Sequence, residues 1–104
     1  MVALPNAGGG VNGLLLAGVV AGAAGVVKVH ALAGIDRAVL LALLDVLLAS
    51  CAERVVRMLV CEVADDPSFA MLQGVVLERG FAREGRVDDF VADGIALDLM
   101  VWRA

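Results

Sequence analysis

Two kinds of hydrophobic pattern alternate along the chain, and together they predict a mixed α/β fold. Strand-length runs rich in valine, leucine and isoleucine occupy residues 14–22, 25–32, 54–63, 81–87 and 95–103. Longer stretches with helical patterning occupy residues 35–53 and 67–79. The run at 54–63 is apolar almost throughout, which is typical of a strand in the interior of a sheet. The predicted order of elements is β-β-α-β-α-β-β, in a single domain spanning residues 1–104.

The first predicted helix is apolar around most of its circumference. Asp36 lies in its first turn, where a carboxylate complements the helix dipole, and Asp45 is nearly the only charge in its middle. A helix of this kind is usually buried on more than one side. We therefore expect either that the rest of the domain encloses it or that its outer face contacts a second subunit. The second case predicts a homodimer or a larger homo-oligomer.

The N-terminal region carries no charged side chain before Lys28. Residues 1–13 are predicted to be a loose leader, because Pro5 and the glycines at 8–10 interrupt any periodic pattern. Residues 13–27 are uncharged and apolar, but a helix needs about 20 such residues to span a bilayer. No positive charges precede the stretch, as they would in a signal peptide. A membrane location is therefore disfavoured, and a small membrane-associated protein is the lowest-ranked alternative.

Composition and charge exclude several classes of protein. Hydrophobic residues make up 62% and charged residues 19% of the chain, so it is too apolar to be disordered. With a net charge of −4 and no basic cluster, it lacks the surface that neutralises nucleic-acid phosphates. Cys51, Cys61 and His30 do not form a metal-binding pattern. Both cysteines lie in apolar stretches, so we expect buried, reduced thiols and a cytoplasmic location.

Three consecutive motifs resemble the GNAT family of N-acetyltransferases: RMLVCEVADD at 57–66, a helix ending in LERGF at 77–81, and REGRVDDFVADGIALDLMVWR at 83–103. The stretch VHALAGIDRAVLLALL, residues 29–44, falls where that family has its acyl-CoA loop and the following helix. The resemblance covers residues 14–103. It implies a GNAT-like central β-sheet flanked by two helices. The chain would be a short form, without the N-terminal strand and helices that supply much of the acceptor pocket in complete members.

The resemblance also implies a binding site for acetyl-CoA. In this family the strand before the loop splays away from its neighbour and hydrogen-bonds the pantetheine arm, a role that would fall on the backbone of Val27, Lys28 and Val29. We therefore expect the strands that end near Val20 and Val29 to diverge into a V-shaped cleft. The cofactor-binding positions implied in this way are Val27, Lys28, Val29, Gly34, Asp36, Arg37 and Ala38.

The loop itself departs from the family pattern. That pattern, Arg/Gln-x-x-Gly-x-Gly/Ala, falls on Ala31 to Asp36, where only Gly34 remains as glycine. The free amides at a helix N-terminus suit a pyrophosphate. Asp36, however, would add a carboxylate beside the pyrophosphate, with Lys28 and Arg37 as the nearby compensating charges. We expect weak affinity for acetyl-CoA and no metal.

The catalytic residues implied by the resemblance are incomplete. The family commonly uses a tyrosine on the second helix as general acid, and this chain has no tyrosine. Glu62 could act as general base through a water, or could simply face solvent or Arg57. The backbone amide of Val29 would polarise the thioester carbonyl. The leading hypothesis is transfer of an acetyl group from acetyl-CoA to a small amine or a protein amine. The alternative is a non-catalytic domain acting in assembly or protein interaction, so whether the chain is an enzyme stays open.

Overall fold

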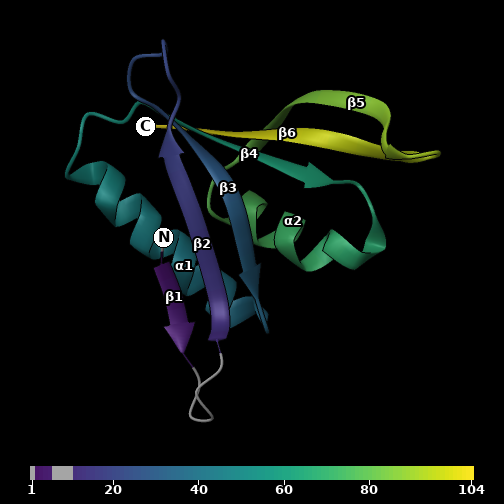
Figure 1. Ribbon diagram of the computed structural model, residues 1–104, viewed down its shortest axis with the longest axis horizontal. Helices are drawn as coiled ribbons and strands as arrows, with labels where there is room; N and C mark the ends of the chain where they lie inside the picture. The colour runs from purple at the N-terminus through teal and green to yellow at the C-terminus, as the bar shows by residue number, and fades with distance from the viewer. Residues whose placement is uncertain (1, 6–10) are drawn as a thin grey trace.

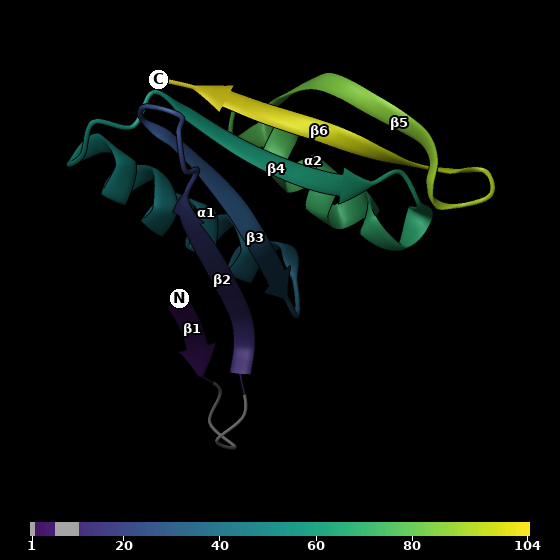
Figure 2. The ribbon, with the colours of Figure 1, turned by 45° about the horizontal axis from the view of Figure 1, so that its top comes forward.

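A mixed β-sheet organises the chain, and both helices pack against one of its faces (Figures 1 and 2). The computed structural model describes residues 2–5 and 11–104. The elements in chain order are β1 (Val2–Pro5), β2 (Val11–Val19), β3 (Val26–Gly34), α1 (Arg37–Ala52), β4 (Met58–Ala64), the 3₁₀ helix η1 (Pro67–Phe69), α2 (Ala70–Glu78), β5 (Ala82–Ala92) and β6 (Ile95–Arg103). The six strands lie in the order β1-β2-β3-β4-β6-β5, with β3 and β4 parallel and the other neighbours antiparallel.

The predicted fold class and the order β-β-α-β-α-β-β are confirmed for residues 11–104. The interior position predicted for the third strand is confirmed as well, because β4 lies between β3 and β6. Alternate residues of β4 point to the helices, and three of them, Leu59, Cys61 and Val63, are buried. Burial of apolar surface is the main favourable term in folding, so this strand anchors the core.

The prediction of a loose leader was wrong for its first residues. Residues 2–5 form β1, which pairs with β2 from Val2↔Leu15 to Pro5↔Val11. β2 in turn begins at Val11 rather than at residue 14. Main-chain hydrogen bonds stabilise such a short edge strand. They do not depend on side chains, so the sequence shows no alternating hydrophobic pattern there. The glycines at 8–10 lie outside the described residues.

The strand predicted at 81–87 is longer than expected, because β5 continues to Ala92. Its second half includes Asp88 and Asp89, which the hydrophobic pattern assigned to a connection. β5 is the edge strand of the sheet and nearly all its side chains are exposed, so carboxylates are tolerated there. Asp89 takes a left-handed backbone conformation at φ 57°, and its Oδ1 accepts a 2.7 Å hydrogen bond from the Gly94 amide.

Helix α1 buries one stripe within the chain, so the rest of the domain does not enclose it, and the first of the two expected arrangements was wrong. Its buried residues are Leu40, Leu43, Leu44, Leu47 and Cys51. Its exposed residues include Ala38, Ala42, Asp45, Ala49 and Ala52. Alanine contributes to an apolar pattern but has little surface to remove from water, so an alanine-rich face can stay exposed at small cost. The expected homo-oligomer stays a prediction.

Residues 13–27 run through β2, a turn and the start of β3. Gly22 and Gly25 have positive φ values in that turn, a conformation that glycine adopts without strain. Across the described residues, no helix is long and apolar enough to cross a membrane.

The two cysteines are free and buried, as predicted. Cys61 lies on the helix side of β4, on the opposite face from its neighbour Glu62. Burial, with a smaller contribution from the Glu62 carboxylate, raises the pKa of the Cys61 thiol from 9.0 to about 11. Burial also raises the pKa of Cys51, an effect that Arg54 partly offsets. Both thiols therefore stay protonated and unreactive near neutral pH.

We predict that stability falls as the pH rises from about 9 to 11. In that window the native chain keeps the Cys61 proton whereas the unfolded chain releases it, so thiolate formation favours unfolding. The shift of about two pKa units corresponds to a loss of about 2–3 kcal/mol of unfolding free energy across the window. Urea denaturation at a series of pH values measures it. The Cys61→Ala variant should lack most of this decline, and an equal decline in both proteins would contradict the assignment to Cys61.

Candidate functional site

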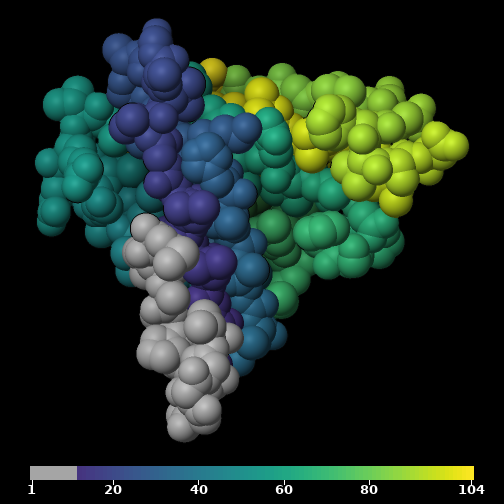
Figure 3. Space-filling model, in the orientation of Figure 1, coloured from purple at the N-terminus to yellow at the C-terminus, as the bar shows by residue number. Residues whose placement is uncertain are grey.

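The sheet divides between β3 and β4. The two strands pair in parallel over four residues only, from Val26↔Met58 to Val29↔Cys61. Beyond that point β3 stays paired with β2, and β4 stays paired with β6, so the two halves of the sheet diverge (Figure 1). The surface is recessed along this line, between the blue atoms of β3 and the teal and yellow atoms of β4 and β6 (Figure 3). We call this feature the β3/β4 splay.

A bulge in β3 accounts for the divergence. The consecutive β2 residues Leu16 and Ala17 pair with Ala31 and Val29, which leaves His30 as an extra residue. A β-bulge bends its strand and increases the local twist, so β3 turns away from β4 directly after Val29. His30 is exposed at this point. Sequence reasoning assigned no role to His30, because a bulge depends on pairing with another strand and has no local marker.

The splay lies on the other side of β3 from the expected one. The strands ending near Val20 and Val29 were predicted to diverge, but β2 and β3 pair from Gly13↔Gly34 to Val19↔Val27. That prediction was wrong because β2 and β3 form a hairpin, in which a short turn keeps neighbouring strands together. β3 and β4 are instead connected through α1, so they can share a short ladder and then separate.

The implied pantetheine residues divide into two groups. Val27 and Lys28 lie inside the parallel ladder with β4, and Val29 is its last paired residue. Among the described residues, the following segment of β3, residues 30–34, has no partner strand on the β4 side. Alternate main-chain groups of this segment point toward the splay, where an extended ligand could pair with them.

The helix start after β3 is capped by the chain itself. Asp36 is the N-cap of α1 rather than a first-turn residue as predicted, and the helix begins at Arg37. The helix begins two residues later than predicted because β3 continues to Gly34. Asp36 Oδ1 accepts a 2.9 Å hydrogen bond from the Val39 amide. An anion at a helix N-terminus would bind this same group of amides, so the Asp36 carboxylate already occupies part of the position of a pyrophosphate.

Gly34 is explained by packing against the helix. A Cβ at this position would lie 3.0 Å from Val39 Cγ1 and 3.2 Å from Leu40 Cγ, which is closer than an ordinary contact. The glycine thus allows α1 to approach β3. The one glycine that the loop shares with the family pattern therefore has a structural reason of its own.

The two cations expected near the loop are engaged elsewhere. Lys28 Nζ lies 3.3 Å from Glu62 Oε1, across the ladder between β3 and β4. Arg37 forms an ion pair with Glu78 at the end of α2. Neither side chain is therefore free to compensate the Asp36 carboxylate without breaking a contact.

Glu62 lies on the sheet face away from the helices, beside the end of the parallel ladder. Its partner is Lys28 and not Arg57, whose Nε donates a 2.6 Å hydrogen bond to the Ala24 carbonyl. The side chain is 43% exposed, so solvent can reach the carboxylate. A carboxylate in this position can accept a proton through a water, as a general base does.

The second helix offers no general acid in place of the missing tyrosine. The corresponding stretch of α2 runs from Gly74 to Leu77, and its two central residues, Val75 and Val76, are fully buried. Within residues 2–5 and 11–104, no group of three or more His, Cys, Asp or Glu side chains is arranged to hold a metal ion. The chemistry available at the splay is therefore main-chain hydrogen bonding, the accessible Glu62 carboxylate with its partner Lys28, and the exposed imidazole of His30.

Comparison with solved structures identifies the fold. A GNAT-family protein from Desulfovibrio desulfuricans superposes with a TM-score of 0.80 at 16% identity, over 90% of this chain and 62% of its own. An acetyltransferase from Bacillus cereus superposes with a TM-score of 0.74 at 16% identity, over 99% of this chain and 71% of its own. The ribosomal-protein-alanine N-acetyltransferase from Brucella melitensis superposes with a TM-score of 0.78 at 15% identity, over 98% of this chain and 67% of its own. No family model matches the chain, and no curated protein matches it.

The chain therefore has the fold of GNAT acetyltransferases, which confirms the resemblance seen in the sequence. It spans less than two thirds of the length of the first of these proteins. At these identities the likeness shows the fold alone, and activity has to be argued from the site.

We predict that the Asp36 cap contributes measurably to stability. Asp36→Ala should lower the free energy of unfolding by about 1 kcal/mol, because the Val39 amide loses its partner. Asp36→Ser keeps a capping oxygen without the charge, and should stay within a few tenths of a kcal/mol of the original. Urea denaturation compares the three proteins. If the alanine variant is as stable as the original, the carboxylate does not hold this position in solution.

Proposed function

We propose that this chain is an acetyltransferase-type domain that binds the acetyl-pantetheine arm of acetyl-CoA in the β3/β4 splay and transfers the acetyl group to an amine. The observation that carries the proposal is the end of the parallel ladder at Val29↔Cys61, after which β3 continues without a partner on the β4 side. The GNAT fold, and the acetyltransferase activity in the names of two of the matched proteins, support it.

The shape of the splay suits an extended arm that carries amides. Pantetheine contains two amide groups, and amides in an extended chain can pair with an open strand edge as an added strand does. The open edge here is supplied by residues 30–34, so we place the arm along these residues rather than along Val27 and Lys28. The thioester would then lie near Val29, at the vertex, where a main-chain amide can polarise its carbonyl.

Acetyl transfer in this site needs one proton acceptor. The amine nitrogen attacks the thioester carbonyl carbon, a C–N bond forms, the C–S bond breaks, and coenzyme A leaves as a thiolate. Glu62 accepts the proton of the attacking amine through a water. Because no tyrosine is present, the thiolate takes its proton from solvent. We assign Glu62 as general base and the Val29 amide as the group that polarises the carbonyl.

The nucleotide end of the cofactor would be held weakly. Two like unit charges about 6 Å apart cost about 2–3 kcal/mol at an effective dielectric constant of 20. The Asp36 carboxylate imposes a cost of this kind on a pyrophosphate, and it already uses the Val39 amide. The binding free energy should therefore come mostly from the thioester arm.

Calorimetric titration with two ligands tests the proposal. S-acetyl-pantetheine has the thioester arm without the nucleotide, so we predict that it binds within about threefold of the affinity of acetyl-CoA. The double variant Ala31→Arg, Asp36→Ser adds a cation, removes the carboxylate and keeps a cap. It should bind acetyl-CoA about tenfold or more tightly than the original chain does, with unchanged affinity for S-acetyl-pantetheine.

Two outcomes would contradict this account. If neither ligand binds the original chain or the double variant, the splay does not take acyl thioesters. If the original chain binds acetyl-CoA far more tightly than S-acetyl-pantetheine, the loop holds the pyrophosphate despite Asp36, and the assignment of binding to the arm is wrong.

A second candidate function, assembly of a homo-oligomer, is favoured by the surface of β5. This edge strand exposes Val87, Phe90 and Val91, with exposed fractions of 54%, 64% and 48%. An open edge with apolar side chains is a template for pairing with a second strand. We propose that two copies of the chain meet along β5.

Light scattering at low micromolar concentration measures the assembly. We predict a dimer mass for the original chain and a monomer mass, near 10.7 kDa, for Phe90→Asp, because a carboxylate at that position would be buried without a partner on pairing. Met71→Asp, which changes an exposed apolar residue on α2, serves as the control and should stay dimeric. A monomer mass for the original chain would refute assembly through β5.

A further inference from the structure

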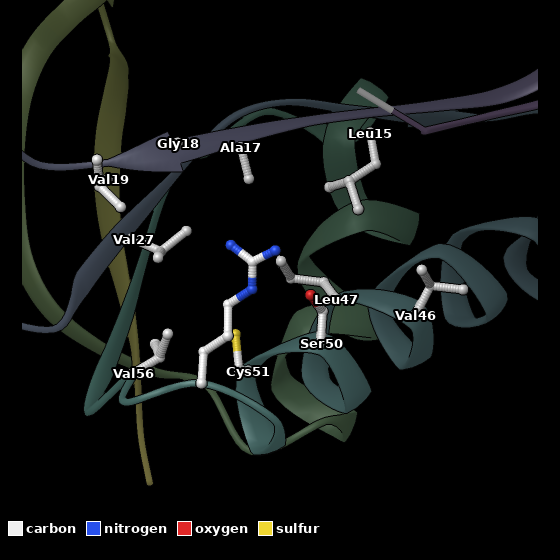
Figure 4. A pocket seen from close by; sticks show the side chains of 11 residues that line it. Leu15, Ala17, Gly18, Val19, Val27, Val46, Leu47, Ser50, Cys51 and Val56 are labelled. Atoms are coloured by element: carbon white, nitrogen blue, oxygen red, sulfur yellow. The ribbon is translucent and has the colours of Figure 1, made fainter.

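A second site lies on the helix side of the sheet, apart from the β3/β4 splay. A pocket of about 370 Å³ opens between the strands and the C-terminal half of α1. Ala17 and Val27 point into it from the strands, and Leu47, Ser50 and Cys51 border it on the helix (Figure 4). Its volume falls at the lower end of the range for small-molecule sites, and most of its lining is apolar, as in such sites.

The lining of the pocket includes one cationic side chain. Arg54 follows the C-terminus of α1 and lines the pocket with Ser50, and no acidic side chain is among the described lining residues. The chain has eight Lys and Arg residues. Seven of them have a carboxylate or carbonyl partner among the described residues. Arg54 is the exception within residues 2–5 and 11–104, so its guanidinium can pair with an external anion.

We propose that this pocket binds a small carboxylate with an apolar tail, such as a short- to medium-chain fatty acid. The tail would replace water against Ala17, Val27 and Leu47, which is favourable in proportion to the apolar area covered. The carboxylate would pair with the Arg54 guanidinium, whose planar donors match its two oxygens. The proposal does not depend on acetyl-CoA binding, because the pocket lies beneath the sheet, whereas Lys28 and Glu62 mark the splay on its other face.

The position of Arg54 is fixed by the turn after the helix. The Arg54 amide donates to the Cys51 carbonyl at 3.2 Å, and its carbonyl accepts from the Val56 amide at 2.9 Å. The base of the side chain is therefore held beside the pocket. An arginine there also complements the partial negative charge of a helix C-terminus, and that role alone would require no ligand.

Titration of the full chain with octanoate, followed by NMR of the backbone amides, tests the site. We predict saturable shifts at residues lining the pocket. Arg54→Gln should weaken octanoate about tenfold, the effect of losing a charge-assisted hydrogen bond. It should leave 1-octanol, which has the same tail without the charge, unchanged. Arg83→Gln removes a charge on the distant edge strand β5, and should bind octanoate as the original chain does.

Filling the pocket gives an independent check. Ala17→Leu should abolish binding of both octanoate and 1-octanol. Ser50→Leu, at an exposed helical position, should have the same effect and replaces Ala17→Leu in the experiment if that variant does not fold. Absence of saturable binding at millimolar octanoate would overturn the proposal. Equal weakening by Arg54→Gln and Arg83→Gln would do so too, since it would indicate non-specific attraction.

Discussion

The parallel ladder between β3 and β4 is the contact on which the rest of the structure depends. It spans four residue pairs, and it alone joins the antiparallel half β1-β2-β3 to the antiparallel half β4-β6-β5 within the sheet. Beneath the sheet, ion pairs between Arg79 and Asp45 and between Arg37 and Glu78 join the end of α2 to α1. The helices thus hold the two halves together while the strands diverge, so the fold keeps an open strand edge without losing its core.

Strand β3 leads from the splay to the N-terminus of α1, where a bound anion and a capping side chain compete for the same free amides. Free amides at a helix start need a partner, and either a bound anion or a side chain can supply it. Here Asp36 supplies it from within the chain, and Gly34 serves the approach of α1 to β3. The chain therefore keeps an open strand edge at the splay and uses the amides of this helix terminus for its own stability.

Burial decided which features could be predicted from the sequence. β4 and the two helices were predictable because their apolar residues face one continuous core. The edge strand β1 and the second half of β5 were not, since pairing rather than burial defines them. The helix start near Asp36 was predicted, but its role as N-cap depends on where β3 ends. The bulge at His30 and the place of Arg54 in the pocket lining depend on contacts between distant segments, so no local pattern signals them.

Hydrogen exchange of the β3 amides, measured with and without S-acetyl-pantetheine, tests the central claim most directly. The amides of residues 26–28, inside the ladder, should be protected already in the free chain, because β3 is paired on both sides there. The ligand should add protection at residues 30–34, where β3 has no partner on the β4 side. Added protection confined to other parts of the chain, or none at all with ligand in excess, would contradict a thioester site in the splay.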